Sequence, residues 1–85
     1  MADHKSAKKR VRQEVRRRAR NRHIRSGLRS AIKTVRTAIA GEADATSALR
    51  AAERTIRRAA SKGVLSKKQA SRKVARLATA VNASR

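Results

Sequence analysis

The chain has 85 residues, with 25 Lys or Arg against 5 Asp or Glu and a formal net charge of +20. That length holds one domain at most, and its core is poor, with 14 Leu, Ile and Val and no Phe, Trp or Tyr. The absence of Cys excludes a disulfide framework and a thiolate metal site. No apolar run is long enough to span a membrane, and none follows the basic N-terminal segment as it would in a secretory signal. We therefore expect a cytoplasmic protein.

The first predicted helix is long and runs from about residue 6 to about residue 40. One face of it carries apolar side chains three or four residues apart: Ile24, Leu28, Ile32, Val35 and Ile39. This is the spacing of an amphipathic helix. Further upstream, Val11, Val15 and Ala19 form a narrow stripe, rotated from that face by about 140° at 100° per residue. The packed face is therefore expected to end near residue 24.

Two shorter helices are predicted, at about residues 44–62 and about 66–83. Their apolar positions recur at helical spacing: Leu49, Ala52, Ile56 and Ala59 or Ala60 in the second helix, and Ala70, Val74, Leu77 and Val81 in the third. Three amphipathic helices with short connections favour an antiparallel bundle. The fold class predicted is therefore all-α, a single domain over residues 1–85. Its first helix is highly basic and protrudes, because the other two are about half as long.

The ends of the helices are marked by turn-forming residues. Gly63 stands where a helix terminus needs a left-handed residue, and Val64 follows as its apolar partner. Ser66 and Gln69 fit the capping-box pattern that begins a helix.

Two other positions leave alternatives open. Either Asp44 or Thr46 could cap the second helix. Gly27 lies within the apolar stretch of the first helix, where Gly costs about 1 kcal/mol relative to Ala. It reflects either a close packing contact or simple tolerance.

The strongest functional signal is the stretch "KSAKKRVRQEVRRRARNRHIR", residues 5–25, in which eleven of 21 residues are basic and Glu14 is the only acid. Cations on nearly every side of a helix fit a place where phosphates approach from several directions. Arg outnumbers Lys by 17 to 8, and guanidinium grips phosphate through two hydrogen bonds. The predicted nucleic-acid contacts in this stretch are Lys5, Lys8, Lys9, Arg10, Arg12, Arg16, Arg17, Arg18, Arg20, Arg22 and Arg25.

A second, weaker basic set surrounds the third helix. Its members, predicted as further phosphate contacts, are Lys62, Lys67, Lys68, Arg72, Lys73 and Arg76.

The sequence offers no catalytic or metal-binding motif. His4 and His23 are far apart with no third ligand near them, and there is no glycine-rich phosphate loop and no nucleophile paired with a base. We therefore predict no enzymatic activity, no metal, no cofactor and no small-molecule substrate.

The absence of aromatic residues bears on the target. Recognition of unpaired nucleotides usually stacks bases on Phe, Tyr or Trp, and this chain has none. The expected target is structured RNA, or duplex DNA without strong sequence preference.

Three stretches, "ADHKSAKKRVRQ", "RNRHIRSGLRSAIKTVR" and "AASKGVLSKKQASRKVARLATAVNA", resemble the S-twenty family of bacterial small-subunit ribosomal proteins essentially from end to end. The resemblance implies a three-helix bundle with an extended first helix. It also implies direct binding of 16S ribosomal RNA early in assembly, by a monomer within the ribosome. By the same resemblance the contacts include His4, Lys5, Ser6, Lys8, Lys9 and Arg10, with Ser61–Gly63 and Lys67–Lys68 as further ones.

Two other readings remain open. A DNA-compacting protein would have a similar composition and would prefer duplex DNA to ribosomal RNA. A membrane-active cationic peptide would need a broad apolar face and usually interfacial aromatics, which the narrow stripe at Val11 and Val15 does not supply.

Overall fold

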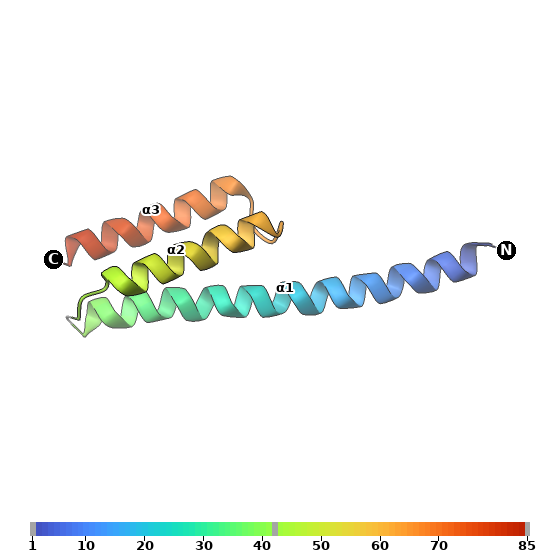
Figure 1. The fold of residues 1–85 in the computed structure, drawn as a ribbon, viewed down its shortest axis with the longest axis horizontal. Helices are drawn as coiled ribbons and strands as arrows, with labels where there is room; N and C mark the ends of the chain where they lie inside the picture. The colour runs from blue at the N-terminus through green and yellow to red at the C-terminus, as the bar shows by residue number, and fades with distance from the viewer. Residues whose placement is uncertain (1, 42, 85) are drawn as a thin grey trace.

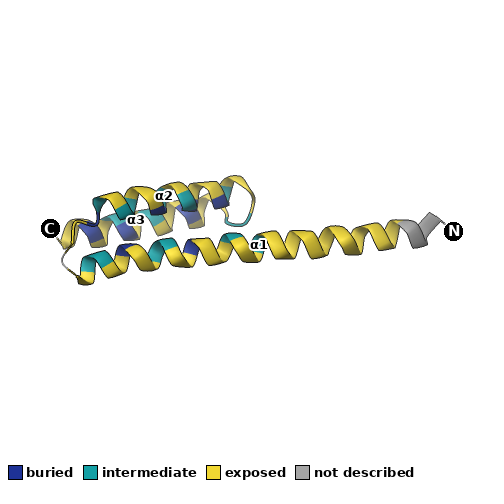
Figure 2. Ribbon diagram, turned by 60° about the horizontal axis from the view of Figure 1, so that its bottom comes forward, coloured by how far each residue is buried: buried dark blue, intermediate teal, exposed yellow. Residues whose placement is uncertain are grey.

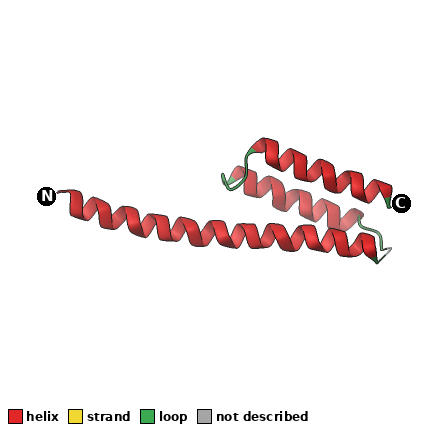
Figure 3. Cartoon of the chain, turned by 180° about the vertical axis from the view of Figure 1, so that it is seen from behind, coloured by secondary structure: helices red, strands yellow, loops and turns green. Residues whose placement is uncertain are grey.

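The described part of the chain forms a bundle of three helices, whose arrangement can be followed in Figure 1. The computed structural model describes residues 2–41 and 43–84, and side chains from residue 6 onwards within those ranges. The helices are α1 (Ala2–Ala40), α2 (Thr46–Ser61) and α3 (Lys67–Ala83). The described residues contain no strand (Figure 3). The predicted all-α antiparallel bundle with a protruding first helix is confirmed.

The length of α1 sets the shape of the molecule. Its 39 residues span about 58 Å at 1.5 Å per residue, and the molecule measures 64 Å along its longest axis. With 16 and 17 residues, α2 and α3 lie beside the C-terminal half of α1 alone, and the N-terminal half projects beyond them (Figure 1).

The core lies where the three helices meet and is built mostly of small side chains. Its buried members are Leu28, Val35, Ala45, Ala52, Ile56, Ala59, Ala70, Leu77 and Val81. Around them pack half-buried apolar residues, including Ile24, Ile32 and Ile39. The apolar stripes expected from the sequence thus face the core, and four of the nine buried residues are Ala.

The turn between α2 and α3 is fixed by local hydrogen bonds. Gly63 has φ +80°, its N–H donates to the carbonyl of Ala60, and Val64 N–H donates to Ala59, both at 3.0 Å. These are the two bonds of a Schellman motif. Gln69 N–H then donates to Ser66 Oγ at 3.1 Å and Gln69 Oε1 accepts from Ser66 N–H at 3.3 Å. The predicted capping box is therefore formed.

The start of α2 differs from the expectation. Ala45, which is buried, occupies the cap position and offers no side-chain hydrogen bond. Asp44 acts from one residue further upstream, where its Oδ1 accepts from Thr46 N–H at 3.0 Å. Thr46 is the first residue of α2 and not its cap. Ala45 occupies the cap position of α2 because its side chain packs in the core.

Gly27 is not a packing contact. It is exposed, and a Cβ built there would meet nothing within 4 Å. The residue stands about 100° around the helix from Leu28, beside the apolar face and not within it. Of the two explanations open from the sequence, tolerance is the correct one.

Candidate nucleic-acid interface

The N-terminal part of α1 stands free of the bundle. Every described side chain from residue 6 to residue 20, which we call the arm, is exposed (Figure 2). Even its two valines are bare, with Val11 59% and Val15 60% exposed. The arm is helical because the segment has no Pro and no Gly to interrupt it. Since α2 and α3 end before reaching it, neither covers it.

The arm displays its cations in all directions. Eight of its 15 residues are basic, and Glu14 is its only acid. At 100° per residue, neighbouring cations are never more than about 80° apart around the helix. No flat surface could engage all of them at once, whereas a concave polyanion could.

Like charges repeat along one line of the arm. Lys8, Arg12, Arg16 and Arg20 are spaced four residues apart, and each like-charge pair at that spacing costs an isolated helix about 0.2–0.5 kcal/mol. An anion that neutralises these side chains would remove the penalty. The arm is therefore a helix whose stability depends on its surroundings.

The arm meets the bundle at Arg20. Its Nη2 donates a hydrogen bond to the carbonyl oxygen of Lys62, at 3.3 Å, across 42 residues of sequence. The next residue, Asn21, is the first half-buried position among the described side chains of α1, and its Oδ1 is buried without a hydrogen-bond partner. The structure thus brings together two cations, Arg20 and Lys62, that the sequence predicts separately.

The second basic set lies on the turn and on α3, and all six of its side chains are exposed. Lys62, Lys67 and Lys68 gather at the end of the bundle from which the arm projects. Arg72 and Arg76 lie further along α3, which runs away from the arm (Figure 1). The structure therefore places only the first three near the base of the arm.

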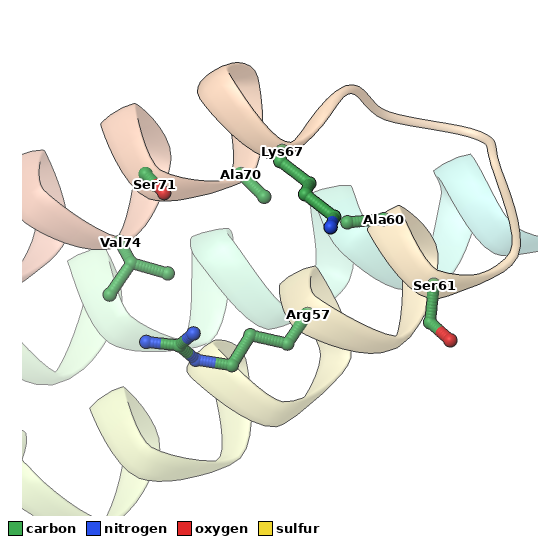
Figure 4. A pocket seen from close by; sticks show the side chains of 7 residues that line it. All are labelled: Arg57, Ala60, Ser61, Lys67, Ala70, Ser71 and Val74. Carbon is green, nitrogen blue, oxygen red and sulfur yellow. The ribbon is translucent and has the colours of Figure 1, made fainter.

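A shallow groove runs between α2 and α3 and has a volume of about 370 Å³ (Figure 4). Its lining residues are Arg57, Ala60, Ser61, Lys67, Ala70, Ser71 and Val74. No carboxylate or imidazole belongs to that lining. The groove has cations and two hydroxyls beside small apolar side chains, and it contains no acid–base pair for catalysis.

Four arginines of α2 are absent from the sequence-based set. These are Arg50, Arg54, Arg57 and Arg58, all exposed. Their spacing places them on the face of α2 opposite the buried Ala52 and Ile56. The same helical spacing in the sequence could have identified them as a basic face. One of them is partly neutralised, because Arg57 pairs with Glu53 at 2.9 Å on the surface.

The remaining expectations concern what the side chains can hold. The side chains of His4 and Lys5 lie outside the described part of the structure. Within the described part, no group of three or more His, Cys, Asp or Glu could hold a metal ion. None of the described helices is both long and apolar enough to cross a membrane.

Together these features define a class: a small, strongly basic helical protein that presents its charge on an exposed arm. The comparisons with known proteins agree. The model of the family described as Ribosomal protein S20 matches residues 2–82. The chain belongs to this family.

Individual relatives match over nearly the whole chain. A small ribosomal subunit protein bS20 from Anaeromyxobacter sp. (strain K) is 57% identical over 82 residues, which cover 94% of this chain and 90% of the relative. Those from Desulfovibrio desulfuricans and Geobacter sulfurreducens are each 54% identical over 84 residues. The matches cover 96% of this chain and 94% and 97% of those relatives.

Family membership confirms the broad predictions. The chain is a structural constituent of the small ribosomal subunit, a component of the cytoplasmic ribosome, and belongs to a family not known to be enzymatic.

Proposed function

We propose that the chain binds 16S ribosomal RNA directly, as a monomer and early in assembly of the small subunit. In this proposal it stabilises folded RNA helices by neutralising their phosphates. The observation that carries the proposal is the arm, a helical segment with eight cations, one acid and exposed side chains throughout.

The physical basis is electrostatic. Each cation that meets a phosphate releases a condensed counterion, which favours binding. Because the arm is charged on all sides, it fits best between RNA helices that converge, where phosphates of several strands face it. Mutual repulsion of those phosphates falls when the arm lies between them, so the RNA helices can pack.

The proposed recognition is of shape. With no aromatic residue to stack on bases, the protein has little means of reading unpaired nucleotides. Phosphate contacts position a protein without reporting sequence. Selectivity then depends on how the phosphates of folded RNA are arranged around the arm and the bundle.

The proposed contacts are of three kinds. At the N-terminal end, family resemblance supports His4, Lys5 and Ser6. The arm and the residues just after it supply Lys8, Lys9, Arg10, Arg12, Arg16, Arg17, Arg18, Arg22 and Arg25. The bundle supplies Lys62, Lys67, Lys68, Arg72, Lys73 and Arg76. Arg20 differs from these, because its guanidinium is already hydrogen-bonded within the protein.

The test is binding to isolated 16S ribosomal RNA without any other ribosomal protein. Excess duplex DNA and an unrelated structured RNA serve as competitors, across a series of salt concentrations. Salt sensitivity alone does not distinguish ribosomal RNA from other nucleic acids. Every phosphate contact adds about 0.7–0.9 to the salt slope, the steepness with which log K falls against log salt concentration, on any nucleic acid. We expect the ribosomal complex to survive both competitors at physiological salt.

Other outcomes would support other functions. Loss of the complex to duplex DNA would refute shape-specific binding and favour the DNA-compacting reading. Leakage from anionic lipid vesicles on adding the protein would favour a membrane activity instead.

A further inference from the structure

The hydrogen bond between Arg20 and the turn differs from the other features of the arm. Arg20 Nη2 reaches the carbonyl oxygen of Lys62, a residue 42 positions away, at 3.3 Å. It joins α1 to the end of α2 at the point where the arm leaves the bundle. The contact engages the Arg20 guanidinium within the molecule, whereas the other cations of the arm make no hydrogen bond or ion pair with any described residue.

The acceptor is suited to a cation. Lys62 is the C-terminal cap of α2, and the carbonyl end of a helix carries a partial negative charge. The Schellman hydrogen bonds of Gly63 and Val64 go to the carbonyls of Ala60 and Ala59, which leaves the Lys62 carbonyl to Arg20. A charged donor makes a stronger hydrogen bond there than a neutral one.

Apolar packing at this end of the bundle is thin. Val64 and Leu65, the apolar residues of the turn, are only half-buried, as is Ile24 on α1, and all three pack against the edge of the core. Asn21, beside Arg20, does not tie the elements together, because its buried Oδ1 has no hydrogen-bond partner. Arg20 therefore supplies a polar link between α1 and the α2–α3 turn where the neighbouring apolar residues are only half-buried.

Three cations lie in the turn that Arg20 contacts or directly after it. Lys62 is its first residue, and Lys67 and Lys68 begin α3 directly after it. If the turn moves relative to α1, these ammonium groups move relative to the arm. Only a fixed turn offers the two groups of cations to one folded RNA at a constant spacing, and such preorganisation favours the partner that matches it.

We propose that Arg20 is a positioning residue that holds the α2–α3 turn against α1. It thereby sets the spacing between the arm and the cations of the turn. The partner is a folded RNA whose phosphates reach both groups at once, so Arg20 contributes selectivity for RNA shape more than charge. This inference rests on the proposed RNA-binding function.

The test compares Arg20→Met with Arg16→Met. Both variants remove one positive charge from an exposed arginine on the same line of the helix, one turn apart. The chain has no Cys, so Gln13→Cys and Ser61→Cys allow two spin labels to report the distance between the arm and the end of α2. We expect Arg20→Met to broaden the distance distribution and to lower the folding equilibrium constant about 3- to 10-fold, as for loss of one hydrogen bond. Arg16→Met should leave the distance distribution unchanged and should not lower the folding equilibrium constant, because it relieves like-charge repulsion with Arg12 and Arg20.

RNA binding by the unlabelled variants provides the second readout. Arg16→Met should lower the salt slope by about 0.7–0.9, as expected for one lost phosphate contact. Arg20→Met should keep the wild-type slope, because in this proposal the Arg20 guanidinium binds the Lys62 carbonyl and not a phosphate. It should reduce the preference for ribosomal RNA over duplex competitor, because the cations that do meet phosphate lose their fixed arrangement.

The failures of the two proposals are distinguishable. An unchanged distance distribution in Arg20→Met overturns the positioning role, and so does a salt slope lowered as in Arg16→Met. If the wild-type protein shows no preference for ribosomal RNA, the proposed function fails. The distance measurement still decides whether Arg20 holds the turn.

Discussion

Two valines of α1 allow the same substitution to be made in the core and on the arm. Val35 is 0% exposed and lies in the core, whereas Val15 is 60% exposed on the arm. Val35→Ala and Val15→Ala each remove two methyl groups from the same helix. Both also gain helix propensity, by at most about 0.6 kcal/mol. The difference between the two variants therefore isolates burial.

The size of that difference follows from the packing. Two buried methyl groups are worth about 1.6 kcal/mol of transfer free energy at about 0.8 kcal/mol per group. The cavity that remains raises the expected cost of Val35→Ala to about 2–3 kcal/mol. A protein of this size has a total stability of about 4–13 kcal/mol, and a core with four alanines among nine buried residues favours the lower end. Val35→Ala should thus remove a large part of the stability, and Val15→Ala almost none.

Urea unfolding followed by far-UV circular dichroism measures both variants. We expect a clear fall in the urea midpoint for Val35→Ala, and a midpoint within experimental error of wild type, or slightly above it, for Val15→Ala. Equal losses in the two variants would refute the division of α1 into a packed half and an unpacked arm. Val15 would then have a packing partner in solution.

Two further predictions concern the backbone. Amide hydrogen exchange should be faster in the arm than at residues 28–39 of α1. It should slow in the arm when ribosomal RNA is added, and an unchanged exchange rate there would contradict stabilisation of the arm by phosphates. Gly27→Ala should stabilise the protein by up to about 1 kcal/mol, because open space surrounds the added methyl. Gly63→Ala should destabilise the protein by about 1 kcal/mol, because Gly63 has a φ of +80°. Urea midpoints that move in the same direction in both glycine variants would refute this contrast.

The fold was predictable because its signals are local. Apolar spacing located the three helices, and the capping box at Ser66 and the left-handed Gly63 are set by neighbours in the sequence. The start of α2 was harder, because Ala45 takes the cap position through burial in the core. That burial depends on contacts with other helices, which local pattern does not report.

The candidate site was predictable in composition but not in arrangement. A run of cations on a helix-compatible segment identifies the arm, and the end of the apolar stripe near Ile24 gives its boundary. The hydrogen bond from Arg20 to Lys62 was not predictable, because it joins residues 42 positions apart. Both residues appear in the sequence as members of separate basic sets.

If the chain binds RNA as proposed, its weak core and its high charge are related. A net charge of +20 opposes compaction of the free chain through self-repulsion, and the small core offsets only part of that. A ligand that binds the folded state alone adds about 2.7 kcal/mol of stability when its concentration is 100 times Kd. That gain is as large as the expected loss from Val35→Ala, so RNA at such a concentration would restore the folded population of this variant. Under the proposed function, the same core defect would then act mainly on the free protein, before RNA is bound, and hardly at all in the RNA complex.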